Sequence, residues 1–173
     1  ATVVGYVIAQ GSGFTERGVC YDIAESPTIE DNKVVYSDSV KQATFNVTLS
    51  GLNYATKYYA RAYAISTSGT IYGEEIVFTT KAVVPMLTTA DITLITGNSA
   101  QGGGNVTATG GAAVTAKGIC FGTEQNPTIE NSITEDGEGV GDFISELSGL
   151  NGNTTYYVRA YASNSVGTAY GNQ

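Results

Sequence analysis

The acidic residues between positions 135 and 142 are the first group whose types and spacing could do chemistry. Glu135, Asp136, Glu138 and Asp142 place four carboxylates in a glycine-rich stretch. Calcium prefers such hard oxygen ligands, so Asp136, Glu138 and Asp142 form a candidate calcium site. The spacing differs from that of an EF-hand, and the matching part of the first half of the chain carries fewer acids. We therefore interpret the stretch first as a solvated turn, and we expect no cofactor.

The two cysteines and the absence of histidine bound the remaining chemistry. The 173-residue chain has no His and no Trp, so neither a Ser-His-Asp nor a Cys-His site can be built, and no His-rich zinc site. Cys20 and Cys120 occupy equivalent places, in Arg-Gly-Val-Cys-Tyr and Lys-Gly-Ile-Cys-Phe. Points one repeat apart are too distant for the Cα separation of about 5.5 Å that a disulfide needs. Each cysteine is interpreted as a packed strand residue, with a reactive thiol or an intermolecular bridge as alternatives. The sequence predicts no enzyme.

Tyrosine and arginine alternate in two matching stretches, which makes them candidate surface-binding residues. The two triplets are Tyr59, Arg61, Tyr63 and Tyr157, Arg159, Tyr161. Alternate residues of a strand share one face, so each triplet forms a stripe on an outer sheet face. Such a stripe could stack on sugars or hold a partner. It could equally cover the sheet through cross-strand and cation–π contacts, and its duplication favours this structural role.

Composition and charge argue against further classes of function. Sixteen acids against eight bases give a net charge of −8, which repels phosphate backbones and disfavours nucleic acid as a partner. No apolar run reaches the 18 residues of a membrane span, and the first residues lack a signal-peptide pattern. The 22 glycines and the frequent Thr and Val indicate strands and tight turns.

The elements that must position these side chains follow from an internal repeat. Residues 51–64 return almost unchanged as residues 149–162. We therefore predict two modules, residues 1–80 and 87–173, joined by an extended linker at 81–86. Strands are predicted at 1–10, 14–21, 34–37, 42–50, 56–66 and 72–80, and in the second module at 87–96, 100–109, 114–122, 143–147 and 154–164. The run Gly102-Gly103-Gly104 has no P-loop spacing and is interpreted as a bulge or bend.

The repeated hallmark resembles a known family. The spacing Leu52-x-x-x-Thr56-x-Tyr58-x-Ala60-x-Ala62-x-Ala64, found again from Leu150 to Ala162, is similar to the E–F corner and strand F of fibronectin type III domains. The resemblance implies an all-β fold of two tandem immunoglobulin-like, fibronectin type III-like β-sandwiches. It also implies structural roles for Leu52, Leu150 and the corner tyrosines Tyr58 and Tyr156, whose hydroxyls bond to nearby backbone.

Further short sequence motifs make the family resemblance more specific. Tyr-Tyr-x-Arg-Ala-Tyr-Ala and Gly-Thr-x-Tyr-Gly resemble fibronectin-III-like tandem repeats of surface and secreted proteins of Bacteroidetes-type bacteria. This implies an extracellular or cell-surface setting and a non-catalytic spacer or adhesive role. The alternative is a glycan-binding accessory module of a surface polysaccharide-processing protein. The triplet Asp38-Ser39-Val40 resembles an acceptor for O-linked glycans in such bacteria.

The two modules do not begin and end with equivalent strands. The strand at 87–96 has no counterpart before Ala1, and the stretch 74–80 that closes the first module has hardly any counterpart after Gly171. We therefore expect the first module to lack its first strand and the second to lack most of its last. Unpaired edges favour association. The expected partners are neighbouring repeats of the same protein, or other copies joined head to tail in a fibre.

Overall fold

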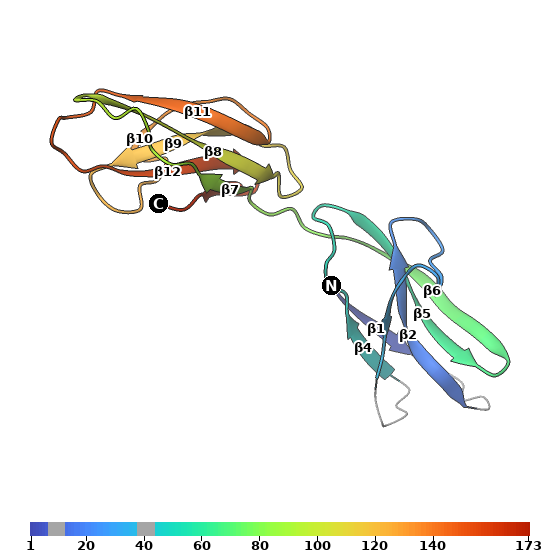
Figure 1. Cartoon of the computed structure of the whole chain (residues 1–173). Coiled ribbons are helices and arrows are strands. Elements are labelled where there is room, and N and C mark those ends of the chain that lie inside the picture. The colour runs from blue at the N-terminus through green and yellow to red at the C-terminus, as the bar shows by residue number, and fades with distance from the viewer. Residues whose placement is uncertain (7–12, 38–43) are drawn as a thin grey trace. The chain divides into compact units, whose positions relative to one another are not determined.

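The computed structural model describes residues 1–6, 13–37 and 44–173, and every regular element in these ranges is a β-strand. The chain divides into two compact units, Ala1–Lys81 and Ala82–Gln173, shown in Figure 1. Within the described ranges, the structure contains no helix that is long and apolar enough to span a membrane.

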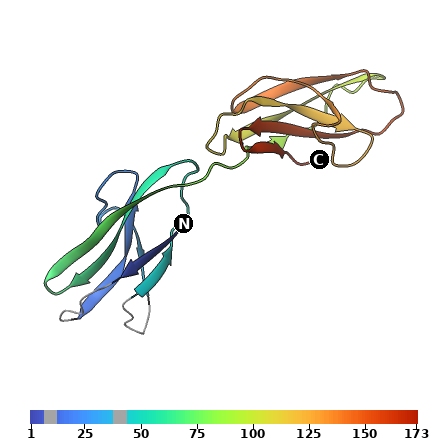
Figure 2. The ribbon, with the colours of Figure 1, turned by 180° about the vertical axis from the view of Figure 1, so that it is seen from behind.

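The first unit consists of two antiparallel sheets. β1 (Thr2–Tyr6) pairs with β4 (Thr44–Thr48), and both views show these strands side by side (Figures 1 and 2). The second sheet has the order β3-β2-β5-β6, formed by β3 (Asn32–Val35), β2 (Phe14–Asp22), β5 (Lys57–Ser66) and β6 (Gly69–Thr79).

The second unit repeats this arrangement and adds one strand. Its smaller sheet has the order β11-β8-β7, formed by β11 (Gly141–Ser148), β8 (Ser99–Ala108) and β7 (Met86–Thr89). Its larger sheet has the order β10-β9-β12-β13, formed by β10 (Ser132–Ile133), β9 (Ala116–Gly122), β12 (Tyr157–Asn164) and β13 (Gly167–Tyr170). Both units are therefore immunoglobulin-like β-sandwiches with the strand arrangement of fibronectin type III domains.

Period-two alternation places the core between the sheets. In β4, Phe45 and Val47 are buried while the residues between them are exposed, and Leu49 continues the pattern. Phe143, Ser145 and Leu147 do the same in β11. Each unit has its own buried apolar cluster, which is what two separate small sandwiches require. The core residues are Val3, Val19, Phe45, Val47, Leu49 and Ala60 in the first unit, and Ala100, Val106, Val114, Ile119, Phe143, Leu147, Ala160 and Ala162 in the second.

The glycine before each Val-Cys or Ile-Cys pair is required because atoms of two neighbouring strands approach it closely. Gly18 lies opposite Tyr63 across the β2–β5 pair, and Gly118 lies opposite Tyr161 across the β9–β12 pair. A Cβ on Gly118 would collide with the carbonyl oxygen of Thr134 and come within 2.9 Å of the Tyr161 ring. The ring of the tyrosine therefore covers the glycine, a cross-strand arrangement that pins the register.

The prediction of one strand over residues 87–96 is wrong beyond its first part. β7 ends at Thr89, and Thr93 alone forms a bridge, to Gln101. The reason is that Thr89 turns toward the other sheet: its hydroxyl accepts a hydrogen bond from Ala160 N–H at 3.0 Å and donates to the Asn172 carbonyl. β7 thus contacts both sheets of the second unit, and Leu94 takes a left-handed backbone conformation with φ 49°.

The bulge predicted at Gly102–Gly104 is absent from the β8–β11 pair. The β8–β11 register runs without a shift from Gly141↔Val106 to Ser148↔Ser99. A Cβ on Gly102 would lie 3.0 Å from the Ile92 side chain, and a Cβ on Gly104 would lie 2.7 Å from Ala160 Cβ in the facing sheet. The three glycines therefore let neighbouring chain segments approach β8 closely.

Adding one methyl group at Gly118 tests the close approach. Gly118→Ala should lower the free energy of unfolding of the second unit by about 1–3 kcal/mol, because the methyl group meets backbone and ring atoms that cannot move apart. Gly122→Ala on the same strand is the matched control, since its Cβ would find only contacts of 3.8–4.0 Å. Urea unfolding measures both; equal effects of the two variants would contradict the packing described here.

Candidate functional site

The outer face of β5 is the first candidate site, because it carries the predicted stripe Tyr59, Arg61 and Tyr63. Tyr59 is 8% exposed. Its hydroxyl donates to Glu25 at 3.2 Å, and the Lys57 ammonium lies 4.8 Å from its ring centroid. These contacts hold the ring within its own unit and leave little of it to a ligand.

Tyr63 is more completely enclosed than Tyr59. It is 2% exposed, and its hydroxyl donates to Glu16 at 2.7 Å. Lys33 bonds the same Glu16 oxygen at 3.3 Å. The hydrogen bond from Tyr63, followed by the bond and charge of Lys33, lowers the pKa of Glu16. Burial, together with the Glu16 carboxylate, raises the pKa of Tyr63. The two effects keep Glu16 charged and Tyr63 protonated near neutral pH.

The arginines of the stripe are fixed in the same way in both units. Arg61 Nε donates to the Gly73 carbonyl at 3.3 Å, and its guanidinium lies 4.5 Å from the Tyr72 ring centroid. Arg159 Nε donates to the Gly171 carbonyl at 3.1 Å, with its guanidinium 4.7 Å from the ring of Tyr170. Cation–π contact and hydrogen bond together attach the last strand to the central strand of each larger sheet.

The stripe of the second unit is less uniform. Tyr161 is 3% exposed and donates to the Thr134 carbonyl at 2.8 Å, whereas Tyr157 and Arg159 are half-buried. The partner changes because Ala116 stands where the first unit has Glu16. Of the six predicted binding residues, the side chains of Tyr157 and Arg159, and of Arg61 in the first unit, keep part of their surface exposed.

The cysteine interpretation is confirmed in its main part: both thiols are free and fully buried. Cys20 Sγ donates to the Pro27 carbonyl at 3.2 Å, and Cys120 Sγ to the Pro127 carbonyl at 3.3 Å. Burial raises the pKa of both thiols, which keeps them protonated and unreactive near neutral pH. Each cysteine ties the following loop to its strand.

The acidic loop has a structural role that the sequence did not reveal. The Asp136 carboxylate accepts hydrogen bonds from Thr134 Oγ1 at 2.7 Å and from the buried Ser145 hydroxyl. In the described part of the chain, no three or more His, Cys, Asp or Glu side chains gather as a metal site. The structure therefore does not bring Asp136, Glu138 and Asp142 together around an ion. The triplet Asp38-Ser39-Val40 lies outside the described residues.

The corner tyrosines have the same geometry in both units. Tyr58 Oη accepts the Asn53 N–H at 3.1 Å, and Tyr156 Oη accepts the Asn151 N–H at 3.1 Å. Their rings pack differently, however. Phe78 stacks on Tyr58 with 5.8 Å between ring centroids, and Tyr58 is 6% exposed, whereas Tyr156 is half-buried.

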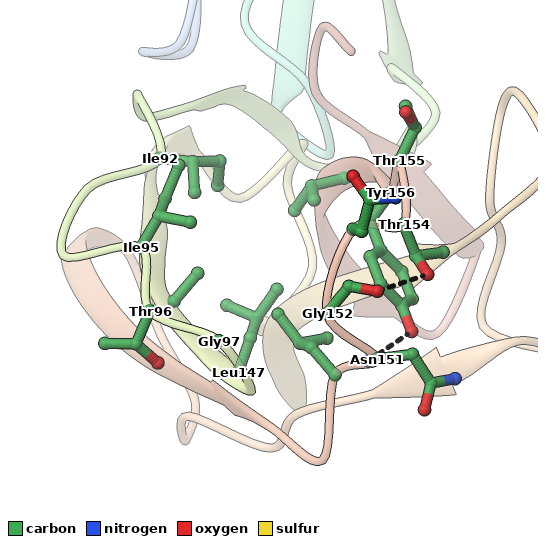
Figure 3. Close-up of a pocket in the computed structure, with 14 residues that line it drawn as sticks. Ile92, Ile95, Thr96, Gly97, Leu147, Asn151, Gly152, Thr154, Thr155 and Tyr156 are labelled. Carbon is green, nitrogen blue, oxygen red and sulfur yellow. Dashed lines mark hydrogen bonds between the residues drawn. The ribbon is translucent and has the colours of Figure 1, made fainter.

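A pocket of about 490 Å³ opens beside Tyr156 in the second unit. Figure 3 shows Ile92 and Ile95 on one side of it and Thr154, Thr155 and Tyr156 on the other. Sequence analysis missed this pocket, because its walls come from the segment after β7 and from the corner before β12.

Comparison with known proteins adds little. No protein-family model matches the chain, and no curated protein matches it. Among solved structures, the chain is similar to the crystal structure of the FN1–FN3 domains of chicken CNTN1, at 15% sequence identity and a TM-score of 0.36. The match covers 91% of this chain and 52% of that one, so this chain spans about half of its length.

The buried thiols and tyrosine hydroxyls of the two larger sheets predict a loss of stability at alkaline pH. Burial raises the pKa of Cys20, Cys120, Tyr63 and Tyr161 above ordinary values of 9.0 for the thiol and 10.0 for the phenol. Above these values the unfolded chain loses protons that the folded chain retains, so the free energy of unfolding falls as pH rises. Thermal unfolding between pH 7 and 10.5 should show a midpoint that declines above about pH 9. A Cys20→Ala/Cys120→Ala variant should decline less steeply, and a wild-type midpoint that stays constant would contradict this reading.

Proposed function

We propose that this chain is a non-catalytic structural segment, a spacer or adhesive part, of an extracellular or cell-surface multi-repeat protein. One observation carries the proposal. The side chains best suited to binding or chemistry are used inside each sandwich, in matching positions of both units. Arg61 and Arg159 bond the last strand, Tyr63 and Tyr161 are enclosed, and the two thiols are buried. Such duplication of internal contacts favours a repeated scaffold over one specific site.

The setting follows from the sequence resemblance together with this architecture. The repeated phrases resemble those of Bacteroidetes-type surface and secreted proteins, which supports a bacterial cell surface as the location. Linked small sandwiches suit a spacer, because each has its own core and the connection is short. The net charge of −8 keeps such a segment soluble and away from nucleic acid.

A glycan-binding role receives less support. Tyr63 and Tyr161 are 2% and 3% exposed, so a sugar ring cannot stack on them without opening the sheet. Tyr157 and Arg159 are the half-buried residues of the second stripe that a glycan could still reach. A glycan array read against Tyr157→Ala would detect this role.

Mechanical unfolding tests the structural proposal. When the chain is stretched between its ends by force spectroscopy, the two units should unfold in two separate events, since each has its own core. Each event should release the contour length of one unit, at about 3.3–3.6 Å per residue. Gly118→Ala should lower the force of one event and leave the other unchanged. A single joint event, or turnover on a panel of esterase and glycosidase substrates, would contradict the proposal.

A further inference from the structure

The corner that precedes β5 in the first unit has the same backbone arrangement as the corner that precedes β12 in the second. Asn53 and Asn151 open these corners, and the N–H of each donates to the hydroxyl of a corner tyrosine at 3.1 Å. Two residues later, Ala55 and Asn153 both take a left-handed conformation, with φ 48° and 58°. The two asparagines therefore occupy one structural position that the chain presents twice.

The residue that follows the asparagine differs between the two corners. Tyr54 follows Asn53, whereas Gly152 follows Asn151, and the sequence contains no other Asn-Gly pair. A side chain at this place hinders the approach of other groups to the backbone nitrogen, and glycine removes the hindrance because it has no Cβ. The second corner thus exposes a backbone nitrogen that the first corner shields.

The groups around this nitrogen are accessible. Asn151 and Gly152 are both exposed. Figure 3 shows the Asn151 carboxamide pointing away from the apolar side chains of Ile92 and Leu147. Asn53 is exposed as well, so the exposure is a property of this corner in both units.

Hydrogen bonds hold the flanks of the second corner but not its reactive groups. The Leu150 N–H donates to the Asn98 carbonyl at 2.9 Å, and Thr154 Oγ1 donates to the Gly152 carbonyl at 3.3 Å. Among the described residues, no protein group bonds the Gly152 N–H or the Asn151 carboxamide. A backbone nitrogen and the carboxamide carbon of the residue before it are therefore both free to react.

We propose that Asn151 is a site of spontaneous deamidation. Asparagine is a thermolabile residue. The Gly152 nitrogen loses its proton to water and attacks Cγ of Asn151, which closes a five-membered succinimide ring, and the side-chain nitrogen takes up a proton and leaves as ammonia. Water then adds to one of the two ring carbonyls and opens the ring, which yields aspartate or isoaspartate. The net reaction consumes one water, releases one ammonia and changes no oxidation state.

The product alters the corner in two ways. Each deamidation adds one negative charge to a chain whose net charge is already −8. In the isoaspartate form the backbone runs through Cβ and Cγ, so the loop gains one further carbon atom. The hydrogen bond from the N–H of residue 151 to Tyr156 Oη must then span a longer loop, which loosens the corner at the start of β12.

Peptide mapping by mass spectrometry tests the site on the full 173-residue chain, kept folded at mildly alkaline pH and physiological temperature. Asn151 should deamidate at least about tenfold faster than Asn53, a difference of about 1.4 kcal/mol between the two activation barriers. The rate at Asn151 should rise with pH, because the attacking nitrogen must lose its proton. Equal rates at the two asparagines, no reaction at Asn151, or reaction only after unfolding in urea would each overturn the proposal.

Exchanging the residues that follow the two asparagines provides matched variants. Tyr54→Gly should raise the rate at Asn53 toward that of Asn151, and Gly152→Tyr should lower the rate at Asn151 toward that of Asn53. A Cβ on Gly152 would lie 3.3 Å from the Gly97 carbonyl oxygen, whereas Tyr54→Gly only removes a side chain that is 42% exposed. An unchanged rate at Asn53 in the folded Tyr54→Gly variant would therefore also overturn the proposal.

The stability of the product tests the consequence for the corner. Anion exchange isolates the deamidated chain through its added charge. The unfolding midpoint of its second unit should be lower than that of the unmodified chain, while the midpoint of the first unit should stay the same. An equal midpoint for the second unit would contradict the loosened corner. All of these outcomes leave the spacer role and its mechanical test unaffected.

Discussion

One inner strand of each four-stranded sheet, β5 in the first unit and β12 in the second, is the constraint on which the rest of the structure depends. β5 and β12 each pair with a strand on both edges and pack against the other sheet on one face. The corner tyrosine points its hydroxyl to the backbone five residues earlier, which fixes where the strand begins. The outer tyrosine covers the glycine of the neighbouring strand, which fixes the register. The arginine between them bonds the last strand, which fixes the edge.

Much of the fold follows from sequence, because these constraints are local and are repeated. The alternation of Phe45, Val47 and Leu49 and the copied hallmark predict two sandwiches and most of their strands. Residues 87–96 could not be predicted correctly. Their apolar pattern is that of a strand, but Thr89 bonds Ala160, more than 70 residues away, and this tertiary contact ends the pairing. The glycines of β8 are likewise explained only by the atoms of other segments that approach them closely.

The candidate site could be predicted only in part. Period two predicts that Tyr59, Arg61 and Tyr63 share one face of β5. Alternation predicts the side of the sheet to which a side chain points, but not how much of that side chain is exposed. Whether an outward tyrosine is free depends on side chains such as Glu16, Glu25 and Lys33, which come from other strands and loops. Asp136 shows the same limit, since a carboxylate in a glycine-rich loop reads as a solvated group until Thr134 and Ser145 are seen to bond it.

The central claim is that the two units share one architecture, in which β5 and β12 pair with β2 and β9 over most of their length. Hydrogen exchange of the free protein measures it directly, because β5 and β12 provide matched amides in a single sample. We predict slow exchange for the amides that pair β5 with β2, and equally slow exchange for those that pair β12 with β9. Fast exchange of either set in the folded chain would contradict it.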